Sequence, residues 1–122
     1  MWGSLGRLGR RADWGAPSPS TRLDELKLVA VDMETTSLDP KTGDIVSLGW
    51  VPINGARIDL SGAGYSVVRG ARVGDDAHVH LLTQEMVDEG IQLDDALSAL
   101  RTALHGGVLL AHFAPVSYTH LT

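Results

Sequence analysis

Two carboxylates two residues apart are the side chains best suited to chemistry in this sequence. Asp32 and Glu34 end an apolar run that begins near Leu26. If that run is a β-strand, side chains at i and i+2 point to the same face, so the two acids lie side by side. Like charges this close repel unless a cation separates them, and oxygen ligands favour Mg²⁺ or Mn²⁺. The spacing predicts a divalent-metal site; the alternative is two unrelated acids at a solvent-facing strand end.

An α/β arrangement is expected to position this pair. Both alternating sets of the run before Asp32 are mostly apolar, which is typical of a central strand covered on two sides. Thr35 and Thr36 follow directly and offer hydroxyl and backbone N–H groups beside the carboxylates. Asn54-Gly55 is a strong hairpin signal, and it predicts an antiparallel meander after the first strand. Strands are expected over residues 26–33, 44–52, 56–60, 65–69 and 108–111.

Two helices are expected between the meander and the last strand. Thr83 is a candidate N-cap for a short helix over residues 84–89, with Gly90 at the C′ position. A second helix is indicated by leucines that recur at helical spacing, and it ends at Gly106-Gly107. These leucines are Leu93, Leu97, Leu100 and Leu104. Strand, helix and strand then follow in the order of an α/β layer.

The segment around the two acids resembles a known motif. Asp32-Met33-Glu34-Thr35-Thr36-x-Leu38-Asp39 after an apolar strand is similar to the first motif of the DEDD, or DnaQ-like, 3′–5′ exonucleases. That family includes the proofreading epsilon subunit of bacterial DNA polymerase III. Residues 79–83 and 108–114 resemble a later family stretch and the start of the second motif. The resemblance covers about residues 26–114.

This resemblance implies a ribonuclease H-like exonuclease fold and hydrolysis of a terminal phosphodiester with two divalent ions, Mg²⁺ or Mn²⁺. Asp32 would ligate or bridge both ions and Glu34 would ligate one, which makes them the catalytic and metal-binding residues. Thr35 and Thr36 would face the terminal nucleotide, and His80 would lie close to the substrate. The implied partners are 3′ ends of single-stranded DNA or RNA and a DNA polymerase subunit.

The sequence also departs from the family pattern. The third acidic ligand should fall where Ser117 stands, and the third motif would lie beyond Thr122. We therefore expect a truncated, inactive N-terminal fragment, with residues 22–115 as the first part of an exonuclease domain. Residues 116–122 resemble a translated sequencing adapter, which predicts a non-native tail.

The composition of the chain excludes some kinds of protein and of metal site. The chain has 122 residues, no cysteine and a net charge of −5, so a disulfide framework and a thiolate metal site are excluded. Residues 1–21 are rich in glycine, serine, proline and arginine without periodicity, and we expect a flexible basic arm. No apolar run is long enough to span a membrane and no secretory signal is present, which predicts a cytoplasmic protein.

Two other functions fit parts of the pattern. Haloacid-dehalogenase-like phosphatases also have two acids at i and i+2 after a strand, but they require aspartate where Glu34 stands. A module that binds nucleic acid or a protein without cutting would agree with the missing third ligand.

Overall fold

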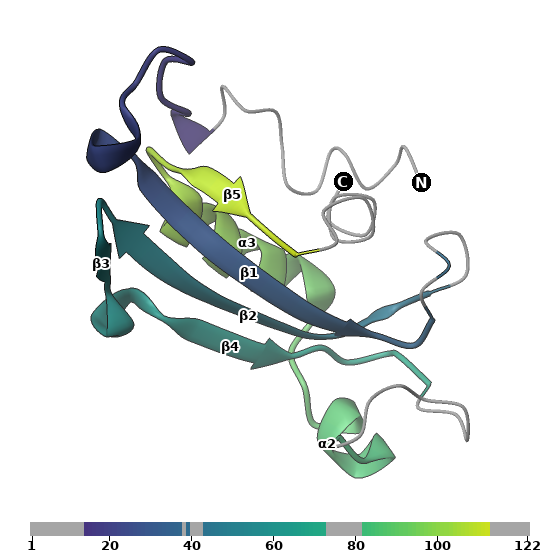
Figure 1. Cartoon of the computed structure of the whole chain (residues 1–122). Helices are drawn as coiled ribbons and strands as arrows, with labels where there is room; N and C mark the ends of the chain where they lie inside the picture. The colour runs from purple at the N-terminus through teal and green to yellow at the C-terminus, as the bar shows by residue number, and fades with distance from the viewer. Residues whose placement is uncertain (1–13, 38, 40–42, 73–81, 113–122) are drawn as a thin grey trace.

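The architecture is an α/β layer in which one helix packs on a mixed sheet (Figure 1). The computed structural model describes residues 14–37, 39, 43–72 and 82–112 of the 122-residue chain. The described strands are β1 (Lys27–Thr35), β2 (Ile45–Asn54), β3 (Arg57–Ile58), β4 (Gly64–Val67) and β5 (Val108–Leu110). The α-helices of the described residues are α2 (Gln84–Asp88) and α3 (Leu93–Leu104), and these residues also form the short 3-10 turns η3 (Leu23–Glu25) and η4 (Leu60–Gly62).

Strand β1 is central, as the sequence predicts. The sheet order is β3-β2-β1-β5, and β4 pairs with β2 beyond the end of β3. β2 runs antiparallel to β1, and β5 runs parallel to β1 with Leu28 beside Val108 and Ala30 beside Leu110. The expected meander followed by strand, helix and strand is therefore present. The hairpin turn differs by one residue, because Asn54 pairs with Arg57 and leaves Gly55 and Ala56 as the connection.

The core lies between the sheet and α3, which runs behind the sheet in Figure 1. Val29 and Val31 of β1 and Leu48 of β2 are buried on this side, and they meet the leucine stripe of the helix. Leu97, Leu100 and Leu104 are buried with them, while Leu93 packs at the edge of the cluster. The helical spacing thus identified the packed face of α3 correctly.

Both helix ends follow the sequence prediction. The Thr83 hydroxyl accepts a hydrogen bond from the Met86 backbone N–H at 3.2 Å, so Thr83 caps α2. After α3, Gly106 has a φ of +74°, the left-handed conformation that favours glycine at this position. Gly90 follows α2 for another reason: a Cβ there would lie 2.6 Å from the carbonyl oxygen of Val67. The Ile91 N–H also donates to that oxygen, at 2.9 Å, so the chain passes close to β4 at this point.

Part of the expected flexible arm belongs to the core. Trp14 is 8% exposed and packs in the α3 cluster, with Ala16 against it. Its indole N–H donates to the Gly107 carbonyl at 3.3 Å, and its own carbonyl accepts from the Gly106 N–H at 2.6 Å. The expectation of a detached arm therefore does not hold at Trp14, because one large side chain packs without any periodic pattern. Residues 1–13 lie outside the described residues.

Candidate metal and nucleic-acid site

Asp32 and Glu34 lie on the face of β1 opposite α3. Burial alternates along the end of the strand: Val31 and Thr35 are buried, whereas Asp32 and Glu34 are exposed. The pairing register places Asp32 beside Gly49 and Glu34 beside Ser47 of β2. The two carboxylates therefore share one accessible sheet face, as their spacing predicts.

The expectation that β1 is covered on both sides is met on one face by α3, and the described residues do not test it on the other face, which we call the open face. The sheet face that carries Asp32 has no described helix on it (Figure 1), and Leu28 and Ala30 on the same face are only half-buried. The described residues therefore leave Asp32 and Glu34 accessible on this face.

The two threonines after the acids are engaged in the loop that follows β1. Thr35 is 8% exposed, and its hydroxyl donates to the Ser37 carbonyl at 2.8 Å. The Thr36 hydroxyl accepts from the Asp44 N–H at 2.9 Å, and the Thr36 N–H donates to the Asp44 carbonyl at 2.9 Å. These bonds close the loop between β1 and β2, so Thr36 keeps an O–H to donate while the Thr35 side chain points into the core.

A shallow hollow borders Asp32. It has a volume of about 320 Å³, and it is lined by Ala30, Val31, Asp32, Gly49, Trp50 and Val51. Gly49 stands in the middle of this set, directly across from Asp32. Sequence reasoning missed Gly49, although a glycine inside a strand pattern often marks a close approach of a ligand or of another chain segment.

The donor chemistry at Asp32 and Glu34 fits Mg²⁺ or Mn²⁺, since both are carboxylates on one accessible face. Within residues 14–37, 39, 43–72 and 82–112, no group of three acidic or histidine side chains is placed to hold a metal ion. The described residues therefore fit part of a metal site, and they do not fit a complete two-ion site. The expected substrate residue His80 and the position Ser117 lie outside the described residues.

Strand β5 directs the chain toward the two acids. Leu110 lies beside Ala30, two residues before Asp32, and β5 runs in the same direction as β1. The segment that resembles the start of the second motif thus leaves the sheet on the side where Asp32 lies, and His112 is the last described residue.

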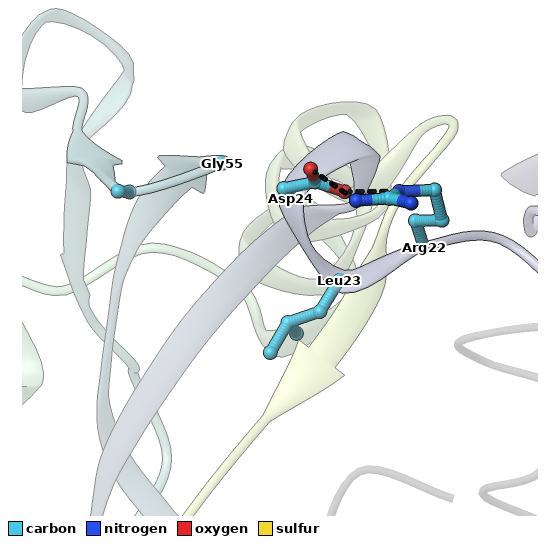
Figure 2. A pocket seen from close by; sticks show the side chains of 5 residues that line it. Arg22, Leu23, Asp24 and Gly55 are labelled. Carbon is cyan, nitrogen blue, oxygen red and sulfur yellow. Dashed lines mark hydrogen bonds and ion pairs between the residues drawn. The ribbon is translucent and has the colours of Figure 1, made fainter.

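A second hollow lies near the other end of β1 (Figure 2). It has a volume of about 580 Å³ and is lined by Arg22, Leu23, Asp24, Gly55 and Ala56. The Arg22 guanidinium makes two hydrogen bonds to the Asp24 carboxylate, both 3.0 Å long. This pairing holds the pKa of the Asp24 carboxyl below its ordinary value. Among the described residues that line this hollow, Asp24 is the one acid, and it is paired with Arg22. The hollow therefore offers no pair of acids like Asp32 and Glu34.

Comparisons with known proteins find a sequence relative and a similar solved structure. No protein-family profile matches the chain. The chain is 26% identical over 106 residues to the PolC-type DNA polymerase III of Thermotoga maritima. The aligned segment covers 85% of this chain and 8% of the polymerase. Among solved structures, cell-death related nuclease 4 (CRN-4) matches with a TM-score of 0.55 and 15% identity. That match covers 66% of this chain and 30% of the nuclease chain.

These comparisons identify the fold class. The mixed sheet with α3 on one face is similar to the fold of a nuclease structure, so the expected ribonuclease H-like α/β fold is confirmed. The antiparallel β1–β2 hairpin fits the phosphatase alternative poorly. In the described part of the chain, no helix is long and apolar enough to cross a membrane; the cytoplasmic location stays a prediction.

Proposed function

We propose that this chain carries the first catalytic motif of a DEDD-type 3′–5′ exonuclease acting on single-stranded DNA or RNA. The observation that carries the proposal is the placement of Asp32 and Glu34 together on the open face, at the end of the central strand of a nuclease-like fold. The likeness to a bacterial DNA polymerase III supports it, because the resembled family includes a proofreading subunit of that class of polymerase. A polymerase subunit is accordingly the proposed protein partner.

In this proposal Asp32 would ligate or bridge two divalent ions, Mg²⁺ or Mn²⁺, and Glu34 would ligate one of them. Bound there, the ions would supply an activated water and neutralise charge on the leaving 3′ oxygen. Thr36 would donate its free O–H toward the terminal nucleotide, since its oxygen already accepts from the Asp44 N–H. Thr35 would act through its backbone position, because its hydroxyl is bonded to Ser37 inside the protein. His80 keeps its proposed place near the substrate.

A non-catalytic binding module is the second candidate. It is favoured by the donor count: the described residues bring two carboxylates together and no third acid or histidine with them. Two ligands alone hold a divalent ion weakly, because Mg²⁺ and Mn²⁺ need several oxygen ligands in good geometry. For this reason we expect the 122-residue chain alone to release no mononucleotides.

The test compares Asp32→Asn and Glu34→Gln with Asp24→Asn in a form of the protein extended by the second and third motifs of the resembled family. Each change removes one negative charge with little change in size, but Asp24 lies at the far hollow. We expect Asp32→Asn to lower Mg²⁺-dependent release of mononucleotides from a 3′ end at least about a hundredfold, because a ligand of the transition state is lost. Asp24→Asn should behave as the parent. Equal rates for all three variants would contradict the catalytic proposal and leave the binding module.

A further inference from the structure

An exposed aromatic side chain lies in register with Asp32, on the sheet face that carries both acids. The pairing of three neighbouring strands aligns Asp32 of β1 with Gly49 of β2, and Gly49 with Tyr65 of β4. Residues paired in this way point to the same face, and two strand spacings separate Asp32 from Tyr65 by about 10 Å between Cα atoms. Tyr65 is 63% exposed.

The tyrosine ring lies against the glycine in the middle of this row. A Cβ at Gly49 would lie 3.5 Å from Cδ2 of Tyr65, which is an ordinary van der Waals contact. The hollow of about 320 Å³ includes both Gly49 and Asp32. The next side chains along the hollow, Ala30 and Val51, are small or apolar, and they add no charge. Tyr65 is not one of the residues that line the hollow, but its ring contacts the Gly49 position, so an exposed aromatic ring adjoins the hollow and the Asp32 carboxylate lies within it.

We propose that Tyr65 and Gly49 form a stacking site for one nucleobase of a single-stranded nucleic acid whose 3′ end lies at Asp32 and Glu34. This inference rests on the proposed function and adds a base-positioning subsite to it. The chemistry favours a base over other flat ligands, because the site joins an aromatic face to the place where the proposed phosphodiester lies. Every base has a π-face, so the site would position a strand without reading its sequence.

A purely structural role is the competing explanation for the Tyr65 ring. Aromatic side chains that cover a strand glycine stabilise sheets by shielding exposed backbone. The two explanations differ in their consequences, since a structural ring changes the stability of the sheet, whereas a stacking ring changes binding of bases. A test must therefore measure both quantities on the same variants.

The experiment measures binding of a short 5′-fluorescein-labelled oligothymidylate to the full chain by fluorescence anisotropy, with Ca²⁺ present. The variants are Tyr65→Leu, Tyr65→Phe and Gly49→Ala. Leu23→Ala serves as a control, because Leu23 is an exposed apolar side chain at the other hollow. The same oligonucleotide backbone without bases is the second probe. Urea unfolding of each variant reports stability.

We expect Tyr65→Leu to weaken oligothymidylate binding about 5-fold to 150-fold, while Tyr65→Phe and Leu23→Ala bind as the parent. Gly49→Ala should weaken binding in the same direction, because its methyl group enters the hollow. The abasic probe should bind the parent and Tyr65→Leu equally. Equal oligothymidylate binding by the parent and Tyr65→Leu, a loss of the urea midpoint that matches the binding loss, or no binding by the parent would each overturn the stacking site.

The two proposals can fail separately. If Tyr65→Leu binds normally while Asp32→Asn stops nucleotide release in the extended protein, the stacking site is wrong and the exonuclease proposal stands. If release does not depend on Asp32 while base binding depends on Tyr65, the exonuclease proposal is wrong and the site is a nucleic-acid binding surface.

Discussion

The two faces of the sheet differ in burial and in residue type, although the same strands form both. Toward α3, β1 presents Val29 and Val31, which are buried against the helix. On the opposite face, β1 presents Ala30, Asp32 and Glu34, which stay half-buried or exposed. Because successive side chains alternate, one strand supplies packing on one side and carboxylates on the other without a break in its backbone pairing. Stability is therefore concentrated on the α3 face, and the candidate chemistry on the open face.

The largest expected effect compares the same truncation on the two faces. Leu100 of α3 is fully buried, whereas Leu110 of β5 is 46% exposed beside Ala30. Leu100→Ala should lower the free energy of unfolding by about 2–5 kcal/mol, because it removes buried methyl groups and leaves a cavity. Leu110→Ala should cost about 1 kcal/mol or less. Urea denaturation measures both, and equal losses would contradict the division between the two faces.

The next comparison concerns the glycines of the two faces. A Cβ at Gly64 would overlap the indole ring of Trp50, which packs against the α3 cluster, whereas a Cβ at Gly49 meets ordinary contact distances. We expect Gly64→Ala to destabilise the fold by about 1–3 kcal/mol, because the packed indole must move. Gly49→Ala should change stability by no more than about 0.5 kcal/mol. Thermal unfolding measures the stability of both variants. A larger loss for Gly49→Ala than for Gly64→Ala would show that the open face is the more tightly packed one.

Local pattern was enough to predict the elements and the shared face of the two acids. The leucine stripe of α3, the Thr83 cap and the i, i+2 spacing of Asp32 and Glu34 each depend on neighbours close in sequence. The alignment of Asp32, Gly49 and Tyr65 was not predictable in this way, because it depends on the register of three strands. That register is set by nonlocal pairing, which includes a bulge between Glu34 and Thr35.

The N-terminal limit of the domain shows the same difference between local and nonlocal information. The glycines, serines and prolines around Trp14 predict an irregular segment, and the chain there is irregular. What the pattern omits is the contact with the turn after α3, which lies 93 residues later in the chain. One tryptophan thus extends the packed region backwards past the predicted boundary at residue 21.

A smaller effect should follow from the hydrogen bond of Trp14. Trp14→Phe keeps an aromatic ring in the core but removes the indole N–H that donates to the Gly107 carbonyl. We expect a loss of about 0.5–1.5 kcal/mol in the free energy of unfolding, together with the loss of part of the packing area. Faster hydrogen exchange at the start of β5 would locate the effect. An unchanged urea midpoint would mean that this segment adds nothing to the packed face.

The smallest effect is expected at the exposed pair Arg22 and Asp24, far from both the core and the carboxylates of the open face. The hydrogen bonds from Arg22 lower the pKa of the Asp24 carboxyl, so the pair favours the folded state while that carboxyl is ionised. This contribution is present above the unfolded pKa of aspartate, near 4, and is lost as the pH falls through the lower folded pKa. Asp24→Asn should therefore lower the urea midpoint slightly at pH 7 in low salt, and the difference should vanish in acid and shrink in high salt. A difference that persists in acid would mean that the Asp24 side chain stabilises η3 by contacts other than its charge.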